Sequence, residues 1–272
     1  MSLATSSPSK DIKWNAADYA ANSVVQQTWA RELIAKLNLR GDEHILDVGC
    51  GDGKVSAELA RAVSRGSATG VDASPQMIGF AKKNFATTEF PNLRFRVMDA
   101  RKIKFDRRFD LIFSNAALHW VDDHQGILRG AGSVLKTGGR LMISCGGKGN
   151  AADVFTALRP EMRRARWRNF FRQMPTPYFF HAPEDYKNWL PRFGFKIQNL
   201  QITPKDATYD GADGFATWLR TTWIPYVQRV PENLREEFIA AVTQRYVAKH
   251  PPDADGAIHV RMVRLEIDAV KV

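Results

Sequence analysis

Three glycines with acidic neighbours form the part of this sequence that is best suited to chemistry. Gly49, Gly51 and Gly53 follow a short apolar run, and Asp47 and Asp52 lie beside and inside the turn. Glycine lets the chain bend sharply and lets a ligand approach the backbone where a Cβ would collide. The amides that begin the next helix add a positive field. The pattern therefore predicts a cradle for a nucleotide-like cofactor between a strand and a helix.

The spacing of these glycines argues against a dinucleotide. Turns that bind a dinucleotide read G-x-G-x-x-G and place a pyrophosphate at a helix N-terminus, whereas residues 49–53 read G-x-G-x-G. The carboxylates of Asp47 and Asp52 would repel a pyrophosphate but would tolerate a cofactor that carries an amino group and a sulfonium. A nicotinamide oxidoreductase is therefore the least favoured function. For the glycines taken alone, a tight turn without a ligand is the alternative.

Two further acidic residues follow predicted strands and suit the other parts of a nucleoside. A carboxylate at Asp72 can accept hydrogen bonds from both hydroxyls of a ribose, and its alternative role, capping the next helix, suits Ser74 better. A carboxylate at Asp99 can accept hydrogen bonds from the exocyclic amine of adenine; the alternative is an exposed acid in a turn. Ala73 and Met77 could flank the adenine ring, although a buried Met is more often part of the core.

The elements that must position these residues alternate between strand and helix. Strands are expected at residues 44–48, 67–71, 93–98, 109–114, 139–144, 195–200 and 258–270. Helices are expected at residues 14–38, 75–85, 127–135, 183–193, 212–228 and 232–248, and within 151–180. This alternation indicates an α/β fold with a doubly wound, mostly parallel, seven-stranded sheet and a helical cap. Ligands bind such sheets beyond the carboxyl ends of the strands, where Asp47, Asp72, Asp99 and Asn115 are expected to converge.

The same pattern divides the chain into segments with different roles. We expect the small and polar residues 1–10 to form a disordered tail, and residues 11–150 to form a cofactor-binding core with an N-terminal lid helix. Residues 151–180 and 212–250 are expected to form the helical cap over the ligand edge of the sheet. Residues 181–211 and 251–272 would supply the remaining helix and strands of the core sheet.

Composition narrows the class of protein. The 272 residues are 44% hydrophobic and 25% charged, as in ordinary globular proteins, and no apolar run approaches the roughly 18 residues that cross a bilayer. The first ten residues lack the apolar segment of a signal peptide. The two cysteines, Cys50 and Cys145, suit a reducing compartment and form no metal-ligand pattern. We therefore expect a cytoplasmic protein without a membrane span or a bound metal.

The net charge of +10 indicates an anionic partner, which would be nucleic acid, an acidic lipid surface or an anionic small substrate. The densest group of basic residues lies in a helix-like segment that also contains aromatic residues. Three interpretations stand for this group: a solvated helix face, a lid that attracts anions, and a nucleic-acid groove. It consists of Arg159, Arg163, Arg164, Arg166, Arg168 and Arg172.

Four segments, in this order and at suitable spacing, resemble the class I S-adenosylmethionine-dependent methyltransferases over about residues 40–145. They are DVGCGDG at 47–53, VDASPQM at 71–77, MDA at 98–100 and FDLIFSNAALHW at 109–120. The resemblance implies that the cofactor is S-adenosyl-L-methionine, with Asp47 among the residues that bind it. It implies that the methionine moiety lies against Gly49, Cys50 and Gly51. It further implies the ribose at Asp72, the adenine at Asp99 and Ala100, and the site of transfer at Asn115.

Within that family, residues 118–121 (LHWV) resemble the small-molecule carboxyl methyltransferases, such as the trans-aconitate and juvenile hormone acid methyltransferases. Tyr19 and Gln26 lie in a segment that resembles one which those enzymes fold over the active site. This finer resemblance implies that Tyr19 contacts the cofactor and that Gln26 faces the acceptor. The malonyl-carrier-protein methyltransferases look alike in this region and remain an alternative.

The activated sulfonium of the donor means that methyl transfer mainly requires a positioned nucleophile. A carboxylate is ionised at neutral pH and needs hydrogen-bond donors rather than a base, for which Gln26, Trp120 and an arginine of the cap are candidates. His119 could instead deprotonate a hydroxyl or an amine. The alternatives are a solvated Gln26, a Trp120 that belongs to the core, and a His119 that holds a backbone carbonyl at the start of a helix.

The sequence therefore predicts an enzyme that O-methylates the carboxylate of a small or amphipathic acid. The alternatives within the same class are methylation of a malonyl-carrier protein or of an O, N or C atom of another small molecule. A protein that binds the cofactor without catalysis is the alternative from a different class. RNA methylation is less favoured, because residues 114–117 read Ser-Asn-Ala-Ala rather than the Pro-Pro-aromatic run of enzymes that methylate amino groups of nucleic acids.

Overall fold

The structure, a computed structural model, describes residues 24–272, with side chains from residue 27 onward. This part of the chain forms two compact units. The core unit contains residues 24–148, 178–203 and 264–272, and the helical unit contains residues 149–177 and 204–263. The expected tail and most of the N-terminal half of the expected lid helix lie outside the described residues, as do Tyr19 and the side chain of Gln26.

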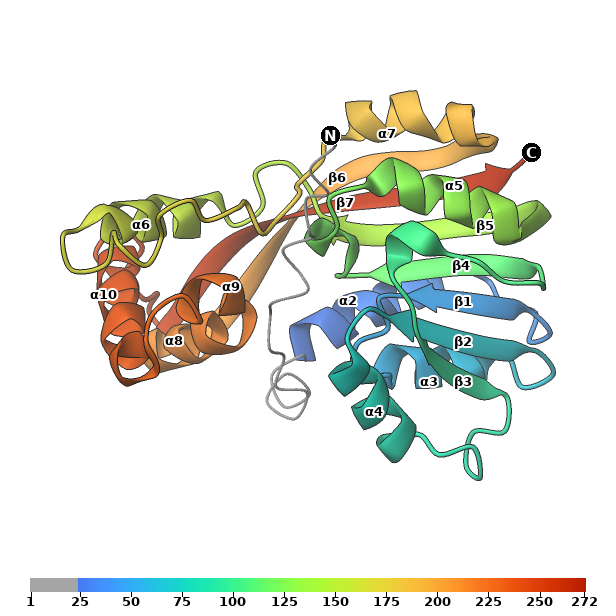
Figure 1. Cartoon of the computed structure of the whole chain (residues 1–272), viewed down its shortest axis with the longest axis horizontal. Helices are drawn as coiled ribbons and strands as arrows, with labels where there is room; N and C mark the ends of the chain where they lie inside the picture. Colours follow the sequence, from blue (N-terminus) through green and yellow to red (C-terminus); the bar gives the residue numbers. More distant parts are fainter. Residues whose placement is uncertain (1–23) are drawn as a thin grey trace, which may run out of the picture. The chain divides into compact units, whose positions relative to one another are not determined.

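A seven-stranded sheet with the order β3-β2-β1-β4-β5-β7-β6 carries the core unit (Figure 1). The first five strands pair in parallel, and β7 pairs antiparallel with β5. The doubly wound, mostly parallel sheet expected from the sequence is thus confirmed. Its strands are β1 (His44–Val48), β2 (Ser67–Asp72), β3 (Leu93–Val97), β4 (Phe109–Asn115), β5 (Leu135–Gly146), β6 (Phe195–Asp210) and β7 (Ala257–Lys271).

Side chains alternate between the two faces of a strand, and this alternation separates two apolar cores. Ile45 and Phe113 belong to a core that contains residues of α2 (Val24–Ala35), α3 (Lys54–Ala62) and α4 (Pro75–Asn84). Leu46 and Ile112 belong to a second core with residues of α5 (His124–Val134) and α7 (Pro183–Trp189). Helices therefore cover both faces of the sheet (Figure 1), which explains why β1 and β4 are largely apolar on both faces.

Short 3-10 helices complete the core unit at the ends of larger elements. They are η2 (Ala100–Lys102) after β3, η3 (Leu118–Trp120) after β4, and η4 (Leu190–Phe193) after α7. Gly194 caps η4 with a φ of 77°, a conformation that glycine adopts without strain.

Several elements differ in length from the sequence-based expectation. β5 begins at Leu135 rather than at 139, and β6 continues to Asp210 rather than ending at 200. Pro204 lies inside β6, which tolerates it because an edge strand needs N–H donors on one side only. The helix expected at 212–228 is divided into α8 (Gly211–Thr222) and α9 (Ile224–Val227), because Pro225 cannot continue a helix from its interior.

The helical unit combines α8 and α9 with α6 (Ala152–Arg163), η5 (Glu232–Leu234) and α10 (Arg235–Val247). A buried carboxylate at Glu161 joins two of these helices by accepting a hydrogen bond from Arg245 at 2.6 Å. The stacked rings of Phe215 and Tyr246, 4.5 Å apart, join α8 to α10. All six arginines of the basic group are exposed. Arg159 and Arg163 lie in α6, whereas the other four lie in the bend and turns that follow it, so the expected helix-like segment ends earlier than the basic group. That these helices cap the ligand edge of the sheet stays a prediction.

Within residues 24–272, no helix is long and apolar enough to cross a membrane.

Candidate active site

The glycine turn after β1 adopts the backbone conformations that its sequence predicts. Gly49, Gly51 and Gly53 have φ values of 77°, 53° and 86°, which other residues reach only with strain. A Cβ on Gly49 would lie 2.2 Å from the Cβ of Ala117, so the turn also needs glycine for space. The amides of Gly49 and Cys50 donate to the carbonyl of Val71, which holds the turn against the end of β2.

Asp72 connects this turn to the next helix. One carboxylate oxygen accepts a hydrogen bond from the amide of Gly51 at 3.1 Å, and the other accepts one from the amide of Ser74 at 2.9 Å. Ser74, as expected, is the cap of α4, because its hydroxyl accepts from the amide of Met77. Burial raises the pKa of Asp72. Each carboxylate oxygen can still accept a further hydrogen bond, so the predicted role at a ribose is compatible with this geometry.

A cavity lies at the carboxyl ends of β1 and β4. Three of its lining residues that the sequence analysis did not single out are Gln27, Lys54 and Ala116. Ala116 follows β4 with a φ of 55°, an uncommon conformation for a residue other than glycine. The predicted residues Asp47, Gly49, Cys50, Gly51 and Asn115 meet here. The full lining consists of Gln27, Asp47, Gly49, Cys50, Gly51, Asp52, Lys54, Val55, Asn115 and Ala116.

The end of this cavity beside the glycine turn is acidic. Burial raises the pKa of Asp47 to about 7, and the nearby charges of Asp72 and Asp52 add to this effect, while a 2.5 Å hydrogen bond from Ser56 opposes it. One buried oxygen of Asp52 has no hydrogen-bond partner within residues 24–272, and the ammonium of Lys54 lies 3.4 Å from it. A positively charged ligand would relieve this crowding of carboxylates.

Cys50 also lines the cavity, and burial raises the pKa of its thiol well above the ordinary value. The acidic neighbours act in the same direction. The side chain therefore stays protonated at neutral pH and is not a nucleophile.

Asp99 lies at the end of β3 as predicted, but Arg101 already occupies its carboxylate. Nε of Arg101 donates to both oxygens at 3.0 and 3.1 Å, its Nη2 donates at 2.6 Å, and its backbone amide donates at 2.9 Å. These bonds lower the pKa of Asp99. An adenine amine at Asp99 must share the carboxylate with Arg101, which the sequence analysis did not foresee. Of the other predicted adenine contacts, Met77 is buried, Ala73 is exposed and Ala100 is half-buried.

His119 and Trp120 lie in η3, directly after the end of β4. Nδ1 of His119 accepts a hydrogen bond from the amide of Gly146 at 3.2 Å, so the ring contacts a backbone amide rather than the backbone carbonyl that was the expected alternative. Burial lowers the pKa of His119 to about 4. The Trp120 ring is half-buried, and its centroid lies 4.7 Å from that of Tyr178.

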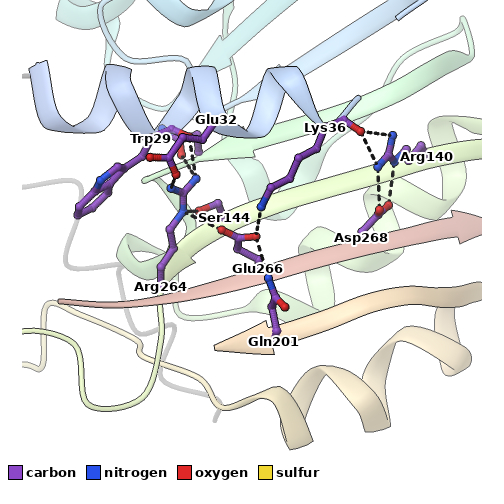
Figure 2. A network of polar contacts seen from close by, with 10 residues as sticks. Trp29, Glu32, Lys36, Arg140, Ser144, Gln201, Arg264, Glu266 and Asp268 are labelled. Atoms are coloured by element: carbon purple, nitrogen blue, oxygen red, sulfur yellow. Dashed lines mark hydrogen bonds and ion pairs between the residues drawn. The ribbon is translucent and has the colours of Figure 1, made fainter. Parts of the chain in front are cut away.

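A polar network links β7 to α2 next to the cavity (Figure 2). The guanidinium of Arg264 donates to the hydroxyl of Ser144, to the carbonyl of Trp29 at 2.9 Å, and to the amide oxygen of Asn115 at 3.4 Å. Burial lowers the pKa of Arg264, against the effects of Glu266 and then of Glu32, which raise it. Asn115, which lines the cavity, thus also contacts a buried cation.

The alternation of β7 was the signal that could have revealed this network. The charged residues Arg264, Glu266 and Asp268 alternate with Leu265, Ile267 and Ala269. The apolar residues pack in the core beside α5 and α7, so the charged residues lie on the opposite face of the sheet, which α2 covers. Their partners Trp29, Asn115 and Ser144 lie far away in the sequence.

Known proteins resemble this chain in sequence and in fold. Residues 39–174 match the family model described as a methyltransferase domain. An uncharacterized methyltransferase of Schizosaccharomyces pombe is 30% identical over 192 residues, which cover 69% of this chain and 72% of that protein. Trans-aconitate 2-methyltransferase of Agrobacterium fabrum is 28% identical over 267 residues, which cover 96% of this chain and 100% of the relative.

The fold similarity extends to proteins with little sequence identity. Phosphoethanolamine N-methyltransferase 2 of Haemonchus contortus, solved in complex with S-adenosyl-L-methionine, matches this structure with a TM-score of 0.60 at 15% identity. The match covers 94% of this chain and 56% of that one.

Proposed function

This chain belongs to the S-adenosyl-L-methionine-dependent methyltransferases, and on that premise we propose that it methylates a carboxylate oxygen of a small or amphipathic acid. The observation that carries the proposal is the similarity to trans-aconitate 2-methyltransferases, which covers 96% of this chain and 100% of the relative in one case. The similarity therefore extends beyond the cofactor-binding segments to the segments that remain for contact with an acceptor.

The glycine turn and its acidic neighbours fit the cofactor. The backbone at Gly49 leaves no space for a Cβ, and the carboxylates beside the turn suit a ligand that carries a sulfonium and an ammonium. In the proposed arrangement the methionine moiety lies against Asp47 and residues 49–51, the ribose against Asp72, and the adenine against Asp99, Ala100, Ala73 and Met77. Bound there, the cofactor supplies an activated methyl group, and Asn115 faces the site of transfer.

A carboxylate acceptor agrees with the properties of His119. With a pKa of about 4, its imidazole is too weak a base to take a proton from a hydroxyl or an ammonium group at neutral pH. One ring nitrogen is also engaged by the amide of Gly146. A carboxylate has lost its proton already and needs only to be oriented. We propose that the half-buried ring of Trp120 forms a wall of the acceptor site, together with Gln26.

The test is a donor-consumption screen over four groups of acceptors: free acids, acyl-carrier thioesters, phenols and RNA. The free acids are trans-aconitate, citrate and dodecanoate. We expect turnover with at least one free acid, and a methyl ester as product, recognised by its release of methanol in mild alkali. Turnover on RNA or phenols alone would contradict the proposal. Turnover on thioesters alone would favour methylation of a carrier-bound acid instead.

A further inference from the structure

The buried guanidinium of Arg264 is a feature of the core unit that the cofactor site does not explain. Its side chain is 3% exposed. Nε donates to Ser144, and Nη2 donates to the carbonyl of Trp29 and to Asn115. The remaining nitrogen, Nη1, is buried without a hydrogen-bond acceptor among residues 24–272. A buried donor on a charged group is costly when nothing accepts from it, so this position suits an anionic ligand.

The carboxylate of Glu32 lies near this unused donor without bonding to it. Its Oε2 atom is 3.6 Å from Nη1, which is within ion-pair distance but too long for a hydrogen bond. The side chain is 42% exposed, so solvent screens its charge. Glu266 does not take its place, because one of its oxygens already accepts from Lys36 and Gln201 and the other lies 3.6 Å from Nε of Arg264.

Arg140 is a structural contact in the same unit and serves as a comparison for Arg264. It joins the residues that follow α2 to β7 (Figure 2). Its guanidinium donates to both oxygens of Asp268, at 2.8 and 2.7 Å, and to the carbonyls of Lys36 and Leu37. Each of its three nitrogens has an acceptor. Arg264 makes a similar connection but keeps one donor unused.

The strand order places Arg264 on the side of the site where the methyl acceptor is expected, which we call the acceptor side. Along the edge of the sheet, Asp99 follows β3, Asp72 ends β2, and the glycine turn follows β1. Next come β4 with Asn115, then β5, then β7 with Arg264. Neighbouring strands are about 4.8 Å apart, so the adenine, ribose and methionine sites follow one another toward β4. Arg264 lies beyond the site of transfer, and its side chain reaches back to Asn115.

We propose that Nη1 of Arg264 binds a carboxylate of the acceptor acid, and that Glu32 holds this position until the acid replaces it. The inference rests on the proposed function. Because a single nitrogen is unused, it engages one carboxylate oxygen and leaves another oxygen of the acid to receive the methyl group. The methionine moiety of the cofactor also has a carboxylate, so the experiment must separate the two ligands.

The experiment compares the wild type with Arg264→Met, Glu32→Gln and the control Arg140→Met. Calorimetry measures S-adenosylhomocysteine binding to each protein, and then trans-aconitate, citrate and dodecanoate binding to each saturated complex. We expect Arg264→Met to weaken acid binding roughly 10- to 100-fold, as for a hydrogen bond to a charged group, with S-adenosylhomocysteine affinity nearly unchanged. Glu32→Gln should strengthen acid binding by about 2- to 5-fold, because the competing charge is gone. Arg140→Met should change neither affinity.

Each other outcome overturns the inference in a recognisable way. A loss of S-adenosylhomocysteine affinity in Arg264→Met with unchanged acid binding would assign the guanidinium to the cofactor. Unchanged acid binding in both Arg264→Met and Glu32→Gln would make Arg264 a structural contact like Arg140, while the proposed function would stand. If Arg264→Met does not fold, the acid affinity of Glu32→Gln, a substitution at a partly exposed side chain, decides the test: stronger acid binding supports the inference and unchanged binding contradicts it. If the wild type neither binds nor methylates any of the three acids, the proposed function fails as well.

Discussion

The two sides of the ligand edge of this sheet differ in charge and in how far apart their partners lie in the sequence. On the β1–β2 side, Asp47, Asp52 and Asp72 crowd around a turn, and the hydrogen bonds to their carboxylates join residues 2 to 21 positions apart. On the β5–β7 side, Arg264 bonds to residues 120, 149 and 235 positions away. The first side suits a cation, whereas the second holds the Arg264 guanidinium beside Glu32 and Glu266 and, on our proposal, binds an anion. A positively charged donor and a negatively charged acceptor could therefore meet near Asn115, between the two.

The two sides also differ in how their buried charges are stabilised. Burial raises the pKa of Asp72 and raises that of Asp47 to about 7, so Asp47 is partly protonated near neutral pH. Arg264 cannot lose its proton at any physiological pH. It is stabilised instead by hydrogen bonds to Ser144 and to the carbonyl of Trp29, and one donor remains unused. The acidic side should thus respond to pH, whereas the basic side should respond to an added carboxylate.

The largest effect is expected on the acidic side from Asp72→Ala. This change removes the acceptor for the amide of Gly51 and the proposed acceptor for the ribose hydroxyls, so we expect S-adenosylhomocysteine affinity to fall about 100-fold or more. Isothermal titration calorimetry measures the loss. Ser74→Ala is the matched control: it removes the cap of α4 and should lower stability by about 1 kcal/mol without a comparable loss of affinity. Equal losses in the two variants would show that Asp72 acts only through the turn.

A second effect on the acidic side, on stability rather than on affinity, is expected from the raised pKa of Asp47. An unfolded Asp titrates near 3.9, whereas Asp47 titrates at about 7 in the folded protein. Between these values the folded state holds a proton that the unfolded state has lost, so stability falls as pH rises from about 4 to about 7. Asp47→Asn removes this titration and still accepts the hydrogen bond from Ser56. Relative to this variant, the wild type should lose up to about 1.4 kcal/mol per pH unit.

Chemical denaturation of the protein without added cofactor, at half-unit steps of pH, provides the free energies of unfolding for both proteins. Parallel curves between pH 4 and 7 would contradict the assignment of a raised pKa to Asp47.

The smallest effect is expected from the exposed basic group at residues 159–172, which tests whether binding of the acid depends on Arg264 rather than on surface charge. Arg163 and Arg168 are exposed, and solvent and salt screen the charges of exposed side chains at physiological ionic strength. The double variant Arg163→Gln, Arg168→Gln should change KM for a free acid by less than about twofold. A KM that rises tenfold would instead assign the basic group to attraction of the substrate.

The acidic side could be predicted from sequence because its residues lie in short segments with regular spacing. Strand 44–48 was placed with both ends correct, and the cap at Ser74 and the stop at Gly194 follow from local backbone preferences. Even there, one contact was missed. Arg101 lies two residues from Asp99 and occupies its carboxylate, and the spacing alone does not distinguish an acid that awaits a ligand from one that is already paired.

The ends of β5 and β6 were misplaced because strand length depends on the neighbouring strands more than on the residues themselves. β5 extends to Leu135 where it pairs with Phe109, and β6 extends past Pro204 because it lies at the edge of the sheet. Neither condition is visible within the segment. The division of the helix expected at 212–228 could have been foreseen from Pro225.

The sequence by itself indicated the fold class and brought Asp47, Asp52 and Asp72 to one turn, because strand–turn–helix units encode their geometry over a few residues. The methyl donor followed from the resemblance of four segments to a methyltransferase family. Only the tertiary structure decided that β7 lies beside β5, that Arg264 meets Trp29, Ser144 and Asn115, and that Arg140 is fully bonded while Arg264 is not. The physical reason is that the hydrogen bonds available to a buried charge depend on every element packed around it. For Arg264 these elements range from Trp29 to Glu266 in the sequence, so the spacing of residues within one segment does not predict its contacts.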